Sequence, residues 1–554
     1  MQTGLDFPEI NQGWLPTYGI NWVSSGILVF CPELRPTLTR PKLDPLLQFT
    51  GVPVRLLQFA LCLSIFAFPH STVAQLTSSG TSADIGLSQL RAANPGLTEG
   101  VGVKAHLVEA FNPGSSDDYV PDLSNPLLSG NSVNVVGFPA TGNLSNVTST
   151  HATESALHFF GSDGVARDLG TGGLSVDSYL VGGQNPANPN APTTSWIDRY
   201  VFNGGQDPDL SGFDRSTVSS HSYIFQTDPN NQLPGLLQRF DYIINETDTT
   251  SVVGTSNNGT LPPGWTPSYN AISVGTSNGA SGGGLTTTYG SGRVAIDVVV
   301  PEPNSSTATP VVAGAVAILQ DAANGSDAAR SEVIRATILA GATKDAGDFN
   351  GTWNRTTTQP LDPTFGAGEL NILNSYNIQQ AGEFNGGTAL LPTALNDFNG
   401  WDYEENLEIN GERFYEFYVG AGSQLEDFSI ALTWNLNVVD TTEGFAEFFG
   451  PAFTPNPLSE QLANLSLELF DSAGNLIDAS LSNVDNVEHI FIGSGLTDGT
   501  YQLRVSNNNL LATDFGLAFR GTLVEAATAV PEPGSMLLLS GLMVGFLSRR
   551  RRVG

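Results

Sequence analysis

One stretch of small residues constrains the fold of this 554-residue chain more than any other. Residues 304–319 read NSSTATPVVAGAVAIL, a run in which Ala, Gly and Val predominate. Small side chains let a helix pack closely inside a core, and Pro310 suits a first helical turn, where its missing N–H costs nothing. We therefore predict a buried helix behind Pro310. Ser306 would lie exposed just before this helix, in the field of free N–H groups that stabilises developing negative charge.

The composition narrows the classes of function. The formal net charge is −32, which argues against a nucleic-acid partner because phosphate binding needs clusters of Lys and Arg. The two cysteines, Cys31 and Cys62, both precede the expected start of the mature chain. The mature chain would therefore have no disulfide and no thiolate, which excludes zinc fingers, Fe–S clusters and cysteine peptidases.

The N-terminal part carries a targeting pattern. Arg55 precedes an apolar run at residues 56–68, and small residues follow at 71–74. This layout predicts a secretory signal peptide with cleavage near Ala74, and the apolar run is short for a membrane span. Residues 1–74 are thus assigned as leader and signal peptide.

The C-terminal end has a three-part order. Val-Pro-Glu-Pro-Gly-Ser at 530–535 is followed by an apolar stretch at 536–547 and four arginines at 549–552. This order resembles the PEP-CTERM sorting signal of Gram-negative bacteria that produce exopolysaccharide. The resemblance implies transient anchoring by a transmembrane helix at the inner membrane, processing of residues 530–554 by sorting machinery there, and release to the cell surface or the outside. Association with exopolysaccharide or the surface would follow. A plain membrane anchor with a positive-inside stop is the alternative.

A second Val-Pro-Glu-Pro occurs at 300–303, directly before the small-residue stretch. Neither an apolar run nor arginines follow it in the order of a sorting signal, so we interpret this repetition as a coincidence.

The string Ser-x-Ala-Thr-Pro-x-Val-Ala-Gly that begins at Ser306 resembles the nucleophile motif of subtilisin-like serine peptidases (subtilases). The usual Gly-Thr before that nucleophile is Asn304-Ser305 here. His151 opens a stretch similar to the family's histidine motif His-Gly-Thr-x-x-Ala, with Ala152 in place of the glycine. The resemblance implies that Ser306 is the nucleophile and His151 the general base. His158, seven residues further on, is predicted to be a packing residue.

The acidic partner of the histidine is the least regular member of this set. Residues 100–110 read as a buried strand that resembles the first catalytic strand of subtilases, which ends in Asp. The matching residue here is Glu109, whose extra methylene must be accommodated because small positioning errors cost much of the rate. Asp117 or Asp118, in the following loop, could serve instead.

An oxyanion donor is expected between the histidine and the serine. Residues 251–259 run from a strand into a turn that resembles the Gly-Asn-x-Gly of the family. The resemblance implies that Asn257 binds the oxyanion. Asn258 would take this role if the register differs by one, and a plain Asn-Gly turn is the structural alternative.

The resemblance implies an α/β fold with a subtilisin-like, mostly parallel sheet flanked by helices at 75–385, and the β-rich runs that follow predict an all-β antiparallel sandwich at 393–525. A Gly-rich hinge at 384–387 would separate the two. Seven short β-rich runs between residues 413 and 522 support the sandwich. It resembles the prepeptidase C-terminal module of secreted peptidases, which implies spacing or binding to substrate or surface.

No cofactor is required by this set of residues, and no metal ligands are assigned. The acidic loop at 207–214 has the spacing of a calcium loop but lacks the Glu at its twelfth position, so an Asx-turn loop is favoured while a structural calcium stays open.

The sequence thus predicts a secreted serine endopeptidase that hydrolyses protein or peptide substrates through a Ser-His-acid triad with Glu in the acid position. The alternative is a catalytically impaired subtilase-fold protein that binds partners or matrix outside the cell. The three departures at Glu109, Ala152 and Asn304 favour this alternative.

Overall fold

The computed structural model describes residues 85–110, 119–136, 148–181, 195–202, 217–225, 233–262, 264–345, 347, 349–439, 459–508 and 511–525. The predicted signal peptide, the C-terminal sorting segment, Asp117, Asp118 and the acidic loop at 207–214 therefore lie outside the described residues.

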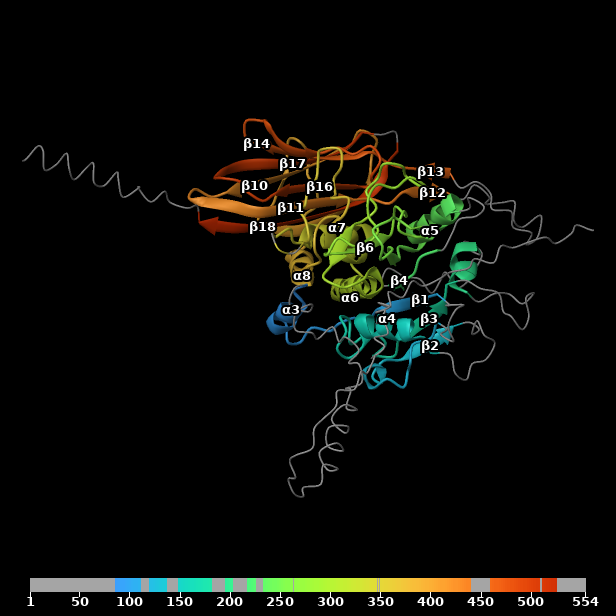
Figure 1. Ribbon diagram of the computed structural model, residues 1–554. Coiled ribbons are helices and arrows are strands. Elements are labelled where there is room, and N and C mark those ends of the chain that lie inside the picture. The colour runs from blue at the N-terminus through green and yellow to red at the C-terminus, as the bar shows by residue number, and fades with distance from the viewer. Residues whose placement is uncertain are drawn as a thin grey trace, which may run out of the picture.

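A parallel sheet of seven strands forms the centre of the first part of the chain (Figure 1). Its spatial order is β2-β3-β1-β4-β5-β6-β7, and every pair in it is parallel. The strands are β1 (Lys104–Glu109), β2 (Val133–Val136), β3 (Val176–Leu180), β4 (Thr217–His221), β5 (Thr250–Gly254), β6 (Ile272–Thr276) and β7 (Val298–Val300). The strands from β4 to β7 are buried along their whole length, as expected of parallel strands covered on both faces.

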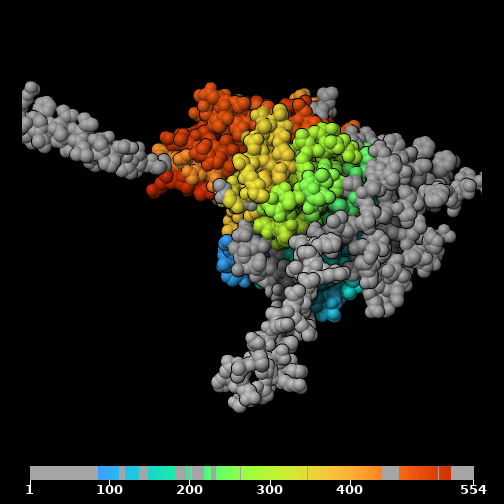
Figure 2. Space-filling view, viewed as in Figure 1, coloured from blue at the N-terminus to red at the C-terminus, as the bar shows by residue number. Residues whose placement is uncertain are grey.

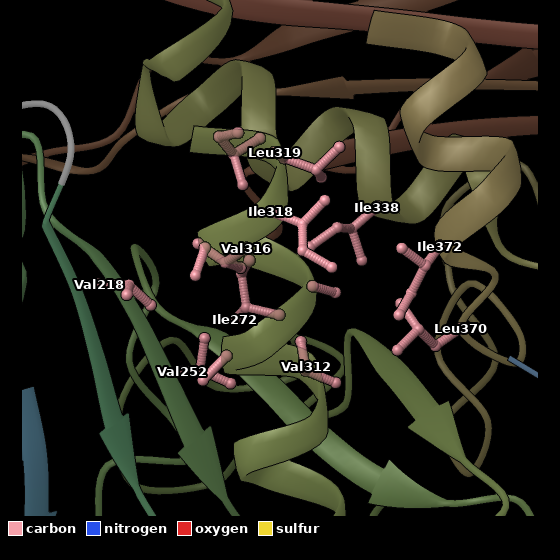
Figure 3. Close-up of a cluster of buried hydrophobic side chains, with 14 of the residues drawn as sticks. Val218, Val252, Ile272, Val312, Val316, Ile318, Leu319, Ile338, Leu370 and Ile372 are labelled. Atoms are coloured by element: carbon pink, nitrogen blue, oxygen red, sulfur yellow. The ribbon is translucent and has the colours of Figure 1, made fainter. Parts of the chain in front are cut away.

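The helices of this part are α3 (Leu87–Ala93), α4 (Thr150–Phe160), α5 (Leu233–Thr247), α6 (Ser305–Ala323), α7 (Ser331–Gly341) and α8 (Ile372–Ala381). Almost every residue of α6 is buried. Figure 3 shows α6 between Val218, Val252 and Ile272 of the sheet and Ile338 and Ile372 of α7 and α8. The prediction of a buried helix at this stretch is confirmed, and so is an α/β fold with helices flanking a parallel sheet.

Close packing explains the small residues of α6. A Cβ added to Gly314 would lie 2.5 Å from Cβ of Val165, in the segment after α4. Any larger residue there would force the two segments apart, at a cost of about 1–3 kcal/mol. Gly314 therefore sets the distance between α6 and the end of α4.

The start of α6 differs from the prediction. Asn304 caps the helix with its side chain, which accepts from Thr307 N at 3.0 Å, so the helix begins at Ser305. Pro310 is consequently the sixth residue of the helix rather than part of its first turn, and Ser306 is the second. The missing N–H of Pro310 leaves the carbonyl of Ser306 without the usual helical donor.

The second part of the chain holds two mainly antiparallel sheets whose buried faces share one apolar core. One has the order β15-β14-β17-β10-β8 and the other β16-β11-β18-β9. Their strands are β8 (Thr393–Ala394), β9 (Asn399–Leu407), β10 (Glu412–Val419), β11 (Ser423–Thr433), β14 (Leu465–Asp471), β15 (Leu476–Ser480), β16 (Val487–Ile492), β17 (Gly499–Asn507) and β18 (Thr513–Glu525), while β12 (Asn437–Val439) pairs with β13 (Ser459–Gln461). The expected antiparallel sheets are confirmed. Strand β9 and the short β8, which pairs in parallel with β10, were not predicted.

The sandwich packs directly on α7 and α8 through the sheet that contains β9, β11 and β18 (Figure 1). In the space-filling view, the orange to red atoms of the sandwich lie directly against yellow atoms of the first part (Figure 2). At Gly516 of β18 an added Cβ would lie 2.6 Å from the backbone of Glu332. The predicted hinge is bonded into the sandwich, since Gly386 N donates to Asp402 Oδ2 at 3.0 Å and Gly387 pairs with Phe414. The two parts therefore share an extensive interface.

A buried carboxyl lies in this interface. Glu332, at the N-terminal end of α7, accepts from Asn435 Nδ2 at 2.8 Å and from Ser331 Oγ at 3.1 Å. Burial, with the nearby Asp248 and Asp514 carboxylates adding to it, raises the pKa of Glu332 to about 8. The neutral acid is thus the form that fits the interface at neutral pH.

We predict that the protein loses stability between pH 7 and pH 9. A carboxyl with a raised pKa binds its proton more tightly in the folded state than in the unfolded state. Its contribution to the free energy of unfolding is therefore present in acid and is lost as the pH rises through the folded-state pKa. The loss should be on the order of 1 kcal/mol and should appear as a falling melting temperature in circular dichroism. Glu332→Gln should flatten this decline, whereas Glu412→Gln, which changes an exposed carboxyl, should leave it. An equal decline in all three proteins would contradict the prediction.

Candidate functional site

The residues singled out in the sequence all lie at one edge of the parallel sheet. Glu109 is the last residue of β1, and Asn257 lies three residues beyond the end of β5. His151 and Ser306 are each the second residue of a helix, α4 and α6 respectively. Since all parallel strands end at the same edge, this edge is the usual place for a site in an open α/β sheet.

Glu109 and His151 are in direct contact. Glu109 Oε2 lies 2.8 Å from His151 Nδ1, with the carboxylate 1% and the imidazole 23% exposed. Ser149 caps α4 by accepting from Ala152 N at 3.1 Å and thereby places His151 in the first turn. Because a carboxylate can only accept, Nδ1 carries the hydrogen, and Nε2 is the basic nitrogen of the neutral ring.

The other four histidines of the mature region are buried in different surroundings. Burial, with Arg199 and Lys104 nearby, lowers the pKa of His106 to about 3, and it lowers the pKa of His221 and His489 well below the usual range. His221 uses both ring nitrogens, toward Tyr223 Oη and Ser219 Oγ at 2.9 Å each. His158 Nδ1 donates to Glu154 O at 2.8 Å. Of the five, His151 is the one that combines partial exposure with a carboxylate partner.

Ser305 and Ser306 have different environments. The Ser305 side chain is buried, and its hydroxyl donates to Thr255 O and lies 2.9 Å from Asn257 Oδ1. Ser306 is half-buried. The hydroxyl that a reagent could reach at this helix terminus is therefore that of Ser306.

The amide groups of the first turn of α6 are almost all satisfied. Three have acceptors: Ser305 N to Asn257 Oδ1 (2.8 Å), Thr307 N to Asn304 Oδ1 (3.0 Å) and Ala308 N to Asn304 O (3.1 Å). Within the described part of the chain, Ser306 N has no acceptor. One unsatisfied donor thus remains at the positive end of a 19-residue helix, beside the accessible hydroxyl.

The amide of Asn257 is oriented by these contacts. Because Oδ1 accepts from Ser305, its Nδ2 group is turned away from that backbone and stays a donor. Asn258 is held differently, with its Oδ1 accepting from Ser256 Oγ at 2.8 Å and Thr260 Oγ1 at 2.9 Å. The structure therefore brings Asn257, and not Asn258, to the start of α6.

One contributing residue carried only a weak signal in the sequence. Gly254 ends β5, and an added Cβ would lie 2.7 Å from Thr309 Oγ1 of α6. A glycine at the end of a strand pattern can mark such a close approach. The glycine lets the start of α6 lie against the strand end that leads to Asn257.

Metal binding has no support in the described residues. They contain no group of three or more His, Cys, Asp or Glu side chains arranged to hold an ion. The acidic loop at 207–214 lies outside them.

Residues 529–552 match the family model of the PEP-CTERM protein-sorting motif. The predicted sorting signal is confirmed, and it indicates export and sorting to the cell surface or the outside of a Gram-negative cell. The expected transmembrane helix finds no support: among the described residues, none of the helices is both long and apolar enough to cross a bilayer. No curated protein sequence matches the chain significantly.

Three solved structures are similar to parts of this chain. The psychrophilic subtilisin-like protease Apa1 from the Antarctic psychrotroph Pseudoalteromonas sp. AS-11 matches 53% of this chain and 97% of its own, at 11% identity and a TM-score of 0.34. The pre-peptidase C-terminal domain of collagenase from Bacillus anthracis matches 25% of this chain and 94% of its own, at 13% identity and a TM-score of 0.15. A family 35 carbohydrate binding module from an environmental isolate matches 23% of this chain and 77% of its own, at 10% identity and a TM-score of 0.14. At these identities and TM-scores the similarities carry no argument about function.

A thiol placed at Ser306 should be unusually reactive. We expect Ser306→Cys, in the full chain with Cys31→Ser and Cys62→Ser, to react with iodoacetamide at pH 7 roughly tenfold faster than a thiol at the exposed Ser129, because a helix N-terminus favours the thiolate. Alkylation rates measured by mass spectrometry test this. Equal rates at the two positions would show that the start of α6 does not stabilise negative charge.

Proposed function

We propose that this chain is a secreted serine endopeptidase of the subtilisin-like type, which hydrolyses peptide bonds of protein or peptide substrates. The observation that carries the proposal is the arrangement at the start of α6. An accessible hydroxyl lies beside an unsatisfied backbone N–H, and a histidine already bonded to a carboxylate stands at the same sheet edge. Subtilase-like motif order in the sequence and the sorting signal for export support it.

The proposed reaction uses each residue in one role. Ser306 Oγ attacks the scissile carbonyl, and His151 Nε2 accepts its proton and then donates it to the leaving amine. Glu109 holds the imidazole through Nδ1 and stabilises the imidazolium that forms. Water then attacks the acyl-enzyme by the same route in reverse and releases the acid product.

Two donors are available for the oxyanion. Within the described residues, Ser306 N and Asn257 Nδ2 are the groups left over after the other first-turn donors and the Asn257 oxygen have found partners. A preorganised donor of this kind typically contributes about 3 kcal/mol to the transition state. Asn257 thus has a double role in the proposal, since its oxygen fixes Ser305 and its nitrogen binds the oxyanion.

The first test is covalent labelling of the full chain. A fluorophosphonate probe should label the native protein but not Ser306→Ala. The control variant Ser305→Ala should still be labelled, because the hydroxyl of Ser305 faces inward. The measurement is the mass of the adduct and the labelled peptide, with melting curves to confirm folding. Well-folded native protein that stays unlabelled would rule out the peptidase and leave the alternative, an impaired fold that binds partners outside the cell.

The second test concerns the length of the acid. Since Glu109 Oε2 already lies 2.8 Å from the ring, shortening it by one methylene in Glu109→Asp should withdraw the carboxylate and lower kcat about tenfold to a hundredfold. Glu109→Gln should lower kcat by about three to four orders of magnitude, because an amide does not stabilise the imidazolium. Hydrolysis of a fluorogenic peptide by the full chain measures both. A faster Glu109→Asp variant would show that the site is built for Asp and is impaired by Glu.

A further inference from the structure

A second pair of a carboxyl and an imidazole lies near the proposed triad. Glu302 stands in the connection between β7 and α6, four residues before Ser306, and its Oε2 lies 3.8 Å from Nε2 of His158. The two side chains are 7% and 5% exposed. His158 lies seven residues after His151 on α4, about two turns along the same face.

The hydrogen bonds restrict where protons can lie in this pair. His158 Nδ1 donates to Glu154 O at 2.8 Å, so Nε2, which faces Glu302, is protonated only in the imidazolium form. Burial raises the pKa of Glu302, while His158 and the Thr307 hydroxyl lower it in part. The two facing atoms therefore attract each other while one proton lies between them, either on the ring or on the carboxyl. A bare carboxylate that faced the lone pair of Nε2 would be repelled.

We propose that Glu302 and His158 form a positioning pair for the proposed reaction, which fixes the start of α6 against α4 and thus Ser306 against His151. The inference rests on the proposed function, because it gives the pair a role in that site. The two helices are in contact further along through Gly314 and Val165. A second attachment at Glu302 prevents α6 from pivoting about that contact. Neither residue touches the substrate.

This reading gives a reason for the Val-Pro-Glu-Pro string at 300–303. The match to the sorting-motif model covers residues 529–552 and not this segment. The segment places one buried carboxyl directly before α6, between two prolines that restrict the backbone.

The pair also predicts a pH dependence. The other titratable side chains on the helices and the strand packed at this point are His151 and Glu154 on α4, Asp321 on α6, and Lys104, His106 and Glu109 on β1. Of these, His151 and Glu109 belong to the proposed triad. A carboxyl with a raised pKa stabilises the folded arrangement in acid and loses this contribution as the pH rises through the raised value. The pair should therefore open, and the rate should fall, at alkaline pH.

The test compares three substitutions in the full chain by the fluorophosphonate labelling rate of Ser306 between pH 5 and pH 10. Glu302→Leu and His158→Leu should each slow labelling at least tenfold, and the double variant should be no slower than either one, because both remove the same contact. Glu302→Gln keeps the shape and can donate to Nε2 at every pH. It should label within threefold of the native rate at pH 7, and its alkaline decline should be smaller than that of the native protein.

A thiol readout separates this proposal from the peptidase itself. In the Ser306→Cys chain without the native cysteines, Glu302→Leu should slow alkylation and Glu302→Gln should restore it, whether or not the native serine is labelled. If native Ser306 is not labelled but the thiol responds in this way, the peptidase fails and the positioning pair stands. Native rates in both leucine variants, or identical pH profiles for the native protein and Glu302→Gln, would overturn the pair. If the leucine variants do not fold, the comparison of the pH profile of Glu302→Gln with that of the native protein tests the positioning pair by itself.

Discussion

Burial of α6 is the constraint on which the rest of the structure depends. A helix enclosed between a sheet and two other helices cannot leave its terminal N–H groups to water, so protein acceptors must meet them. Asn304 and Asn257 provide these acceptors, one from the helix cap and one from the end of β5. The donor that they leave open, Ser306 N, lies where the helix reaches the sheet edge. The hydrogen bonds that satisfy the buried start of α6 are thus the same ones that leave a donor at the candidate site.

Buried polar groups with protein partners also hold the contact between the sandwich and the parallel-sheet part. Asn486 of the sandwich donates to Tyr269 O at 2.8 Å and to Trp434 O at 2.7 Å, and Asp485 Oδ1 accepts from Val294 N at 3.0 Å. These groups are buried, so separation of the two parts would expose or orphan polar atoms from both. Together with Glu332 they make the sandwich a structural part of the molecule, whatever else it binds.

Patterns that are local along the chain could be predicted from the sequence, and contacts across the fold could not. The small residues of α6 and the alternating strands of the sandwich each carry their own periodicity. The helix start was misplaced because Pro310 is a strong local signal, whereas the Asn304 cap depends on the backbone around it. Strand β9 was missed because polar residues in its middle and second half interrupt the alternation. The role of Glu302 was not predicted because its partner, His158, lies on a helix that is far away in the sequence.

The glutamate in the acid position has an energetic meaning that the sequence alone does not show. Glu109 is almost fully buried and, within the described part of the chain, its Oε1 accepts no hydrogen bond. A buried carboxylate with one partner is costly while that partner is neutral, and the cost falls when the partner becomes a cation. The peptidase proposed above would form such a cation on the His151 ring when Ser306 gives up its proton, directly beside this carboxylate. A carboxylate with full hydrogen bonding would have a lower free energy in the resting protein and would stabilise that cation less. The poor solvation of Glu109 thus agrees with the role that the proposed peptidase gives it.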